Sequence, residues 1–340
     1  DTFRVYLSKG KIMDCYDCEK KKTIAAVVCT YNGEKYISSQ LTSIIKQSVS
    51  PDFILIIDDC SDDRTVEKAR MILSTYKNPF RIIKKKTNLG LKNSIEIAVN
   101  TIENDWILFA DQDDVWKPNK VEEFSIAISH NKNANLIFTD AIVTDTELQP
   151  IDSLWNRVQF TPNEWPLVNS LDKSILFRRN VVTGATMGVK TTFAKSCLPI
   201  VDIPYVLHDY WFALNGLLTQ SIVAIPNELI SYRQHGSNTV GVRSLSLYSK
   251  VLRTLKKIGC TFEDIDDNQY LALELLKRGN YNEHGEHTLQ KWIEFEEKRK
   301  YCAFAKKKKI KRIRDLLNID YSQFGRNKYH IFQDICKLLM

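Results

Sequence analysis

WILFADQDDVWKP, residues 106–118, joins a short apolar run to a group of acidic residues. Residues 106–110 have the length and composition of a strand that is buried on both faces of a sheet. Asp111, Asp113 and Asp114 follow directly, and Pro118 then suits the first turn of a helix. A buried strand, a polar turn and a helix in this order are typical of a parallel α/β sheet, which binds ligands beyond the carboxyl ends of its strands.

The same alternation of apolar strand and amphipathic helix repeats along the chain. Helices are predicted where inward-facing apolar residues recur at helical spacing. Parallel strands need such crossovers, so we predict an α/β fold with a Rossmann-like, mostly parallel sheet flanked by helices. The other predicted strands cover residues 23–30, 53–59, 81–85, 136–140, 221–225 and 228–233.

Composition divides the 340 residues into three parts. Residues 1–22 are polar and irregular, and we expect an N-terminal extension there. The periodic pattern fills residues 23–243, which predict one α/β domain. Residues 245–340 hold 20 Lys or Arg against 13 Asp or Glu, which accounts for the whole net charge of +7. We therefore predict that residues 244–340 form a basic, helical C-terminal extension.

No apolar run approaches the roughly 18 residues that a membrane-spanning helix needs. The first residues also lack the apolar core of a signal peptide. The eight cysteines are scattered, and Cys15 and Cys18 form a lone Cys-x-x-Cys without the second pair that a zinc site requires. These features predict a cytoplasmic protein.

A strongly basic stretch lies within the C-terminal extension. Ten of the seventeen residues in 298–314 are basic and none is acidic, while Tyr301, Phe304, Ile310 and Ile313 recur at partly helical spacing. Such a basic amphipathic helix suits an anionic membrane surface. We expect peripheral binding to the inner face of the cell membrane, and no nucleic-acid partner.

The acidic turn after residue 110 has the spacing of a metal site. Asp111 and Asp113 stand at i and i+2 after a strand, so both can approach one hard cation such as Mg²⁺ or Mn²⁺. Such a cation neutralises charge on a departing nucleoside diphosphate. An isolated Asp-x-Asp is more often a solvated acidic turn, but its position after a central strand favours the metal site.

Two other predicted strands end in residues that suit a nucleotide. A carboxylate at Asp59 can accept hydrogen bonds from a base or ribose, and the alternative is an Asx turn with Ser61. Residues 31–33 follow the first strand at the same edge of the sheet. Asn88-Leu89-Gly90 resembles a backbone turn that lets a base approach closely.

Two later segments carry candidate catalytic and phosphate-binding groups. Asp209, after His208, precedes an aromatic helix, where a carboxylate held in a cleft can remove the proton of an acceptor hydroxyl. The alternative is that Asp209 caps the helix. Arg233 and His235 end a strand in a donor-rich turn that suits a diphosphate or a metal, although a lone histidine is more often structural.

Residues 23–238 resemble the inverting family 2 glycosyltransferases of GT-A fold, because five motifs occur in the order found in that family. The motifs are Thr30-Tyr31-Asn32-Gly33, Asp58-Asp59-x-Ser61, Asn88-Leu89-Gly90, Asp111-Gln112-Asp113-Asp114 and Asp209. The resemblance implies Asp209 as the catalytic base. It implies a Mg²⁺ or Mn²⁺ site at Asp111, Asp113 and His235. It implies nucleotide and donor contacts at Thr30, Tyr31, Asn32, Asp59, Asn88, Gly90, Asp111, Gln112, Arg233 and His235.

Three segments more narrowly resemble a rhamnosyltransferase-like branch that builds bacterial O-antigen, capsule or cell-wall polysaccharide. They are Asn180-Val181-Val182-Thr183-Gly184, His208-Asp209-Tyr210-Trp211 and Tyr232-Arg233-Gln234-His235-Gly236. This branch implies dTDP-L-rhamnose as the donor, a UDP-hexose as the alternative, and a saccharide acceptor linked to polyprenyl diphosphate. His208 stands where many relatives carry a second acid, which leaves the surroundings of Asp209 open.

The implied reaction is a single displacement in which an acceptor hydroxyl attacks the anomeric carbon and the configuration inverts. A receiver-type signalling domain is a non-enzyme alternative. Such domains carry a pair of acidic residues after the first strand, whereas this chain has Thr30-Tyr31-Asn32 there. A haloacid-dehalogenase-like phosphatase needs its Asp-x-Asp on the first strand. A catalytically inactive, nucleotide-binding or sugar-binding relative is the remaining alternative.

Overall fold

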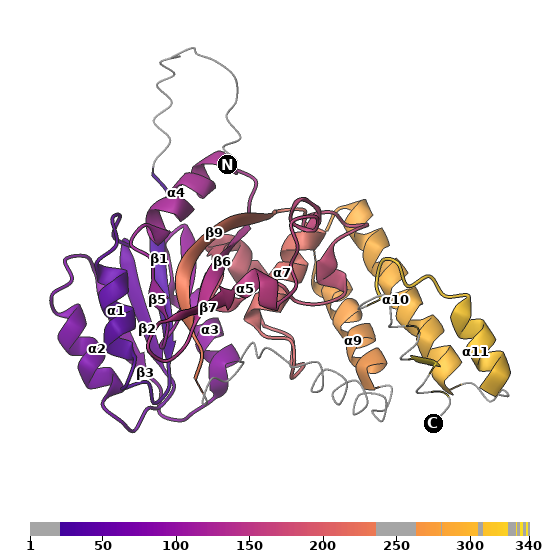
Figure 1. Cartoon of the computed structure of the whole chain (residues 1–340), viewed down its shortest axis with the longest axis horizontal. Helices are drawn as coiled ribbons and strands as arrows, with labels where there is room; N and C mark the ends of the chain where they lie inside the picture. Colours follow the sequence, from indigo (N-terminus) through magenta and orange to yellow (C-terminus); the bar gives the residue numbers. More distant parts are fainter. Residues whose placement is uncertain are drawn as a thin grey trace, which may run out of the picture.

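The computed structural model describes residues 21–235, 263–279, 281–304 and 309–325, with Ile331, Asp334, Ile335 and Leu338. Most of the predicted N-terminal extension, the predicted boundary at 243/244, Cys15, Cys18 and Gly236 lie outside these residues. A sheet with helices on both faces forms one side of the molecule, and the C-terminal helices stand on the other (Figure 1).

The sheet is mixed but mostly parallel, with strand order β3-β2-β1-β4-β8-β6-β9-β5 and β7 paired to β6. One set of strands shares a direction: β1 (Ile24–Thr30), β2 (Phe53–Asp58), β3 (Phe80–Lys84), β4 (Trp106–Asp111), β6 (Leu136–Thr144) and β9 (Ile222–Arg233). The others run the opposite way: β5 (Val115–Trp116), β7 (Pro150–Ser153) and β8 (Met187–Lys190). The predicted fold class is confirmed, with β8 inserted antiparallel between β4 and β6.

Helices cover both faces of the sheet, so successive strand residues are buried on opposite sides. Val27 and Leu55 pack in one core with α3 and α7, whereas Val28 and Ile56 pack in the other with α1, α2 and α4. This double burial explains why the central strands are continuously apolar. The helices are α1 (Ile37–Ile45), α2 (Thr65–Leu73), α3 (Gly90–Thr101), α4 (Lys120–His130), α5 (Leu154–Arg157), α6 (Thr191–Ser196) and α7 (His208–Leu218). Short 3₁₀ helices are η1 (Trp165–Leu167), η2 (Ile175–Phe177) and η3 (Gly184–Thr186).

The two strands predicted over 221–225 and 228–233 are one strand, β9. Its register against β6 shifts where Ile225 pairs with Thr139 and Glu228 pairs with Asp140. Pro226 lacks an N–H and cannot donate to the ladder, so the strand bulges there instead of ending.

The C-terminal extension contains α9 (Glu263–Arg278), α10 (Glu283–Phe304) and α11 (Lys309–Leu317). The prediction of one basic helix over residues 298–314 is wrong, because these residues are divided between α10 and α11. Arg312 of α11 donates from Nε to the carbonyl of Cys302, over 2.7 Å, which holds the start of α11 against the end of α10.

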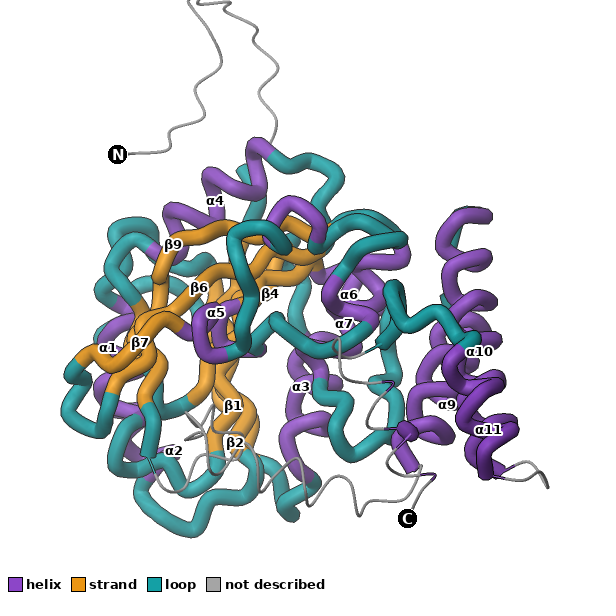
Figure 2. The backbone as a smooth tube through the Cα atoms, turned by 45° about the vertical axis from the view of Figure 1, so that its right-hand side comes forward, coloured by secondary structure: helices purple, strands orange, loops and turns teal. Residues whose placement is uncertain are grey.

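The extension packs against α7, which lies between it and the sheet (Figures 1 and 2). The Tyr281 hydroxyl donates to Asn215 Oδ1 of α7 over 2.7 Å. Nearby, Trp292 stacks on Phe324 and meets the edge of Phe177, with ring centroids 6.2 and 5.5 Å apart. The helical extension therefore shares a hydrophobic core with the α/β domain.

Part of the basic stretch is used inside the extension. The Arg299 side chain is fully buried and pairs with Glu296 and Asp334, over 2.5 and 2.8 Å. Arg299 is therefore unavailable to a membrane, and its two carboxylate partners balance the buried charge.

Trp292→Ala is expected to destabilise the protein by about 3–5 kcal/mol, because it removes a fully buried aromatic side chain from the shared core. Thermal unfolding measures this loss. The control is Tyr270→Ala on α9, where the side chain is 45% exposed. Equal stability of wild type and Trp292→Ala would contradict the docking of the extension.

Candidate active site

Buried hydrogen bonds join the carboxyl ends of β1 and β2. The Asp58 carboxylate is fully buried and accepts from the Thr30 and Ser61 hydroxyls, over 2.8 and 2.5 Å. The alternative of an Asx turn between Asp59 and Ser61 is wrong, because the Ser61 N–H donates to Asp58 Oδ1, three residues before it, at 3.0 Å. The Thr30 side chain points into the fold, so this residue shapes the turn.

Asp59 directly follows β2, and its side chain contacts the backbone at the start of α3. Its carboxylate accepts the N–H groups of Leu89 and Gly90, over 2.8 and 2.7 Å, and pairs with Lys85 Nζ at 2.6 Å. Asn88 Oδ1 also accepts the Gly90 N–H at 3.1 Å, and Gly90 has a φ of 82°. Asp59, Asn88 and Gly90, predicted as separate donor contacts, thus form one hydrogen-bonded turn that glycine favours.

The turn after β1 is locked to the acidic turn after β4. Gln112 accepts the Tyr31 N–H at 2.9 Å and donates to the Tyr31 carbonyl at 3.0 Å. A Cβ on Gly33 would lie 2.1 Å from Gln112 Oε1, so only glycine allows this approach. Asn32 adopts a φ of 48° and accepts the Asp62 N–H, while the Tyr31 ring remains 49% exposed. An exposed aromatic ring at a strand end suits stacking against a base.

The end of β9 contacts the acidic turn directly. His235 Nε2 lies 2.7 Å from Asp113 Oδ2, and the His235 ring stacks on Tyr36 with centroids 4.8 Å apart. Arg233 donates its backbone N–H to Asp114 and its Nε to the Asp113 carbonyl, over 3.0 and 2.8 Å. Arg233 is buried and holds the backbone of the turn, whereas His235 reaches a predicted metal ligand.

The acidic turn carries more negative charge than its surroundings balance. Burial, and then Asp113 and Asp209, raise the pKa of Asp111 to about 7. Burial also raises the pKa of Asp114 well above its usual range, and its Oδ2 has no hydrogen-bond partner among the described residues. A cation near these carboxylates would relieve this unfavourable burial.

The donor set fits Mg²⁺ or Mn²⁺. Asp111, Asp113 and His235 offer carboxylate oxygens and one imidazole, which these cations accept together with diphosphate oxygens and water. The three predicted ligands do not meet at one point, and the described part of the chain holds no group of three His, Cys, Asp or Glu that is close enough to hold a metal alone. The Asp113 carboxylate instead contacts His235.

Sequence reasoning missed Lys120. Its side chain is fully buried, donates to the Ala185 carbonyl at 2.8 Å and lies 3.9 Å from the centre of the Trp116 ring. Burial lowers its pKa to about 7, while Asp114 and Asp111 oppose this shift. Phe124, four residues after Lys120, lies on the same helix face, and this spacing was the sequence signal that Lys120 could face the core.

Asp209 lies in the first turn of α7. The N-cap is Leu207, without a side-chain cap, so the alternative in which Asp209 caps the helix is wrong. Asp209 Oδ1 accepts the Tyr210 N–H at 2.7 Å. Burial raises the pKa of Asp209 to about 6, and hydrogen bonds from Tyr210, Gly184 and Asn180 limit the rise.

Asp209 and the acidic turn share one site. The charge of Asp209 contributes to the raised pKa of Asp111. Burial raises the pKa of the Tyr232 hydroxyl, and four neighbouring carboxylates add to this effect. In order of their effect they are Asp111, Asp114, Asp113 and Asp209. The charges of the predicted metal ligands Asp111 and Asp113 and of the predicted base Asp209 therefore all act on Tyr232.

His208 does not replace an acid in this site. It is 4% exposed, meets the edge of Phe109 with centroids 5.3 Å apart, and burial lowers its pKa to about 4. A Cβ on Gly184 would lie 2.5 Å from His208 Nε2. His208 is thus a neutral packing residue that requires glycine opposite it.

Known proteins resemble this chain in sequence. Residues 25–180 match the family model described as Glycosyl transferase family 2. An uncharacterized glycosyltransferase of Haemophilus influenzae is 28% identical over 223 residues, 64% of this chain and 68% of that protein. The dTDP-rhamnosyl transferase RfbG of Shigella flexneri is 34% identical over 119 residues, which cover 34% of this chain and only 41% of RfbG.

Two solved structures show the same fold. Staphylococcus aureus TarS in complex with UDP-GlcNAc has a TM-score of 0.58 at 16% identity, covering 93% of this chain and 89% of that chain. The mannosyltransferase PcManGT from Pyrobaculum calidifontis, in complex with GDP-Man and Mn²⁺, has a TM-score of 0.50 at 11% identity, covering 94% and 87%. At these identities the likeness shows the GT-A fold alone.

Proposed function

We propose that this protein, a glycosyltransferase whose residues 25–180 match the Glycosyl transferase family 2 model, moves a sugar from a nucleoside-diphosphate donor to a saccharide hydroxyl with inversion at the anomeric carbon. One observation carries the proposal. The charges of Asp209 of α7 and of the aspartates at the end of β4 all act on one buried side chain, Tyr232, and His208, next to Asp209, meets Phe109 of β4 with ring centroids 5.3 Å apart. An inverting transfer needs a base on one side of the anomeric carbon and charge stabilisation on the other.

In this mechanism Asp209 accepts the proton of the acceptor hydroxyl as that oxygen attacks the anomeric carbon. Asp111 and Asp113, with His235 beside Asp113, would hold Mg²⁺ or Mn²⁺, which neutralises charge on the leaving diphosphate. Gln112 keeps the β1 and β4 turns together. Both substrates are thereby oriented in one crevice.

We assign the nucleotide to the edge formed by Tyr31, Asn32, Asp59 and the turn at residues 88–90. Similarity to RfbG supports dTDP-L-rhamnose as the donor, and the TarS complex with UDP-GlcNAc keeps a UDP-hexose as the second candidate. The acceptor we propose is a saccharide linked to polyprenyl diphosphate, used in O-antigen, capsule or cell-wall synthesis. We also retain residues 23–243 as the catalytic domain and 244–340 as its extension.

A thermal-shift panel of dTDP, UDP and GDP, each with Mn²⁺, tests this proposal. A ligand present at about 100 times its dissociation constant adds about 2.7 kcal/mol, which raises the melting temperature of a protein of 340 residues by roughly 4 °C. We expect the largest shift with dTDP. If the largest shift occurs with UDP, the donor is a UDP-hexose and not dTDP-rhamnose. No shift with any nucleotide would contradict the proposed function.

The transfer rate is expected to depend on pH through Asp209. Its pKa is raised to about 6, and only the ionised carboxylate accepts a proton, so the rate should fall about tenfold per pH unit below that value. Initial rates at saturating donor, acceptor and Mn²⁺ measure this fall in rate at low pH. A rate that stays constant from pH 8 down to pH 5 would contradict Asp209 as the base.

We propose that the extension binds the inner, cytoplasmic face of the cell membrane through α11. No described helix is long and apolar enough to span a bilayer. Ile310 and Leu317 of α11 are 83% and 58% exposed, and Lys309, Lys311 and Arg314 share this short helix. Exposed apolar and basic side chains together suit an anionic lipid surface.

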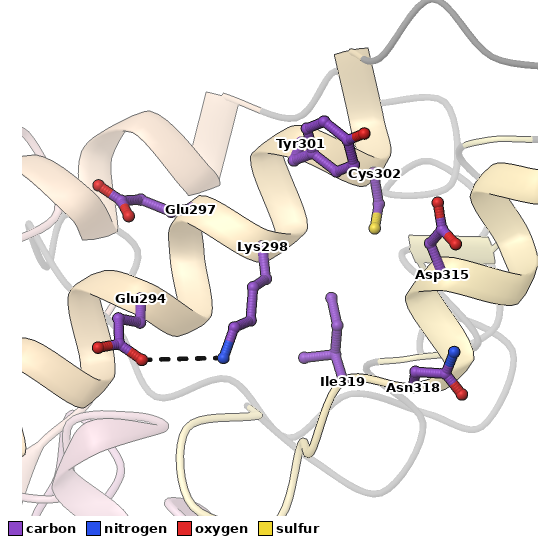
Figure 3. Close-up of a pocket in the computed structure, with 8 residues that line it drawn as sticks. All are labelled: Glu294, Glu297, Lys298, Tyr301, Cys302, Asp315, Asn318 and Ile319. Carbon is purple, nitrogen blue, oxygen red and sulfur yellow. Dashed lines mark ion pairs between the residues drawn. The ribbon is translucent and has the colours of Figure 1, made fainter.

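A hollow of about 480 Å³ between α10 and α11 does not suit an anionic headgroup (Figure 3). Glu294, Glu297 and Asp315 line it, and Lys298 lies 3.8 Å from Glu294. This hollow is therefore excluded from the membrane-binding surface that we propose.

Vesicles containing phosphatidylglycerol are expected to sediment the protein at low salt, and binding should weaken as salt screens the charges. Lys311→Glu should reduce the bound fraction further than Lys132→Glu, an exposed lysine after α4 that serves as the control. Binding that is absent, or unaffected by salt, would contradict this role of α11.

A further inference from the structure

Lys120, the first residue of α4, buries its ammonium group completely. The Nζ atom donates to the Ala185 carbonyl at 2.8 Å and lies 3.9 Å from the centre of the Trp116 ring. The Phe124 ring, one turn further along α4, is centred 5.9 Å from the same atom. Lysine is almost never fully buried unless its charge is paired, and here a carbonyl and an aromatic face are the partners.

One contact of the ammonium lies directly after the acidic turn. Trp116 belongs to β5, which begins at the residue after Asp114, and its backbone N–H donates to Ser43 Oγ of α1 at 2.9 Å. Its ring is buried, and β5 pairs with β9, the strand that precedes His235. The Trp116 ring therefore connects Lys120 to the part of the site that we propose for the metal.

The other contact belongs to η3, which borders the start of α7. Ala185 is buried in the middle of η3, and a Cβ on the preceding Gly184 would lie 2.5 Å from His208 Nε2. His208 is the first residue of α7, and Asp209 follows it. The carbonyl that accepts from Lys120 is therefore next in sequence to the backbone that packs against His208.

A second side chain of α4 meets the same segment. Phe124 lies on the same helix face as Lys120, and a Cβ on Gly188 would be 2.6 Å from Phe124 Cε1. Gly188 belongs to β8, which follows η3 directly and pairs with Leu108 of β4. The segment formed by η3 and β8 thus packs against both α4 and β4.

We propose that Lys120 is a positioning residue that fixes the start of α7, and with it Asp209, relative to the acidic turn. The inference rests on the proposed roles of Asp209 as base and of the acidic turn as metal site. Packing alone does not require an ammonium, because a methionine of similar length fills the space without burying a charge. The ammonium adds a directed hydrogen bond to η3 and an electrostatic contact with Trp116.

Lys120→Met tests this role, because it keeps the length of the side chain and removes its charge and its hydrogen bond. We expect kcat to fall roughly 10- to 100-fold, since a displacement of about 1 Å in a catalytic site can cost 100-fold. The dissociation constants of dTDP and UDP with Mn²⁺ should change less than about twofold, because the acidic turn keeps its carboxylates. The control is Lys77→Met, an exposed position after α2.

Thermal unfolding separates positioning from stability. In Lys120→Met the Ala185 carbonyl loses its partner, but the cost of burying an ammonium is removed as well. These effects oppose each other, so the melting temperature should change little while kcat falls. A role in stability alone would lower the melting temperature and leave kcat unchanged at temperatures where the variant is folded.

Gly184→Ala disturbs the same path from its other end. The new methyl group has to displace His208, so we expect kcat to fall while binding of dTDP and UDP with Mn²⁺ persists. If Lys120 acts through η3, the double variant Lys120→Met/Gly184→Ala should lose little more than the weaker of the two single variants. Losses that multiply would contradict this path.

Lys120→Gln provides a second variant if Lys120→Met folds poorly. Its amide is uncharged and ends one bond short of the position of the ammonium, so neither contact is kept at its present length. We again expect a lower kcat with unchanged binding of dTDP and UDP. A folded Lys120→Gln with the wild-type kcat would then overturn the role of Lys120.

The outcomes distinguish this inference from the function on which it rests. Turnover retained in Asp209→Asn, or wild-type protein that binds neither dTDP nor UDP with Mn²⁺, would overturn the function and with it the role of Lys120. Loss of turnover in Asp209→Asn, combined with the wild-type kcat in folded Lys120→Met, would overturn the role of Lys120 alone.

Discussion

Asp209→Asn is expected to lower the transfer rate by roughly 100- to 10,000-fold, the range that general-base catalysis contributes. Asparagine keeps the shape of the side chain but cannot take up the proton of an acceptor hydroxyl. The change removes one of the four carboxylates whose charges act on Tyr232, and the acidic turn after β4 remains intact. Nucleotide binding should therefore persist while kcat collapses.

Steady-state rates with the nucleotide sugar and acceptor identified by the nucleotide panel measure this loss. Asp172→Asn is the matched control, because Asp172 is exposed and lies outside the site. A variant at position 209 that turns over at the wild-type rate would remove the base from the mechanism.

Asp113→Ala is expected to reduce transfer by roughly 100- to 1,000-fold, comparable to removing one group that stabilises transition-state charge. The change removes the carboxylate that contacts His235 at 2.7 Å. It leaves Asp111 and Asp114 in place, so the remaining turn should bind a divalent cation weakly rather than not at all.

Titration of transfer activity with Mn²⁺ measures this effect. The concentration of Mn²⁺ for half-maximal rate should rise in Asp113→Ala and stay unchanged in Asp202→Ala, an exposed control. Full wild-type activity in excess chelator would eliminate the metal from the mechanism.

Parallel topology explains which parts of the site could be predicted. Thr30 pairs with Asp58 and Cys29 pairs with Asp111, so the ends of β1, β2 and β4 are neighbours in the sheet. Continuous apolar strands followed by polar residues are visible in the sequence. The convergence of these strand ends, and the fold class, follow from that pattern.

The remaining contacts depend on tertiary packing that periodicity does not encode. The contact of His235 with Asp113 requires β9 to reach β5 after a bulge at Pro226. The sequence does not reveal that the Lys120 side chain points into the core, because lysine normally lies on a solvated helix face. Arg299 lies in a stretch that resembles a membrane-binding helix by composition, yet its buried partner Asp334 lies far along the chain.

Two sequence signals have local partners that the sequence does not reveal. Asp59 suits a nucleotide contact, and its carboxylate accepts two backbone N–H groups at the start of α3. His208 stands where an acid is expected, and it fills the space that Gly184 leaves. In both cases the chemical group was visible in the sequence, but its partners were not.

The most direct test is calorimetric titration of the preferred nucleoside diphosphate, with and without Mn²⁺. It asks whether the acidic turn binds the metal and the diphosphate while Asp209 serves only as the base. We expect wild type and Asp209→Asn to bind the nucleotide with the same Mn²⁺-dependent affinity. We expect Asp113→Ala to lose the gain in affinity that Mn²⁺ gives. Equal binding by all three proteins, with no effect of Mn²⁺, would contradict a metal-binding role of the acidic turn.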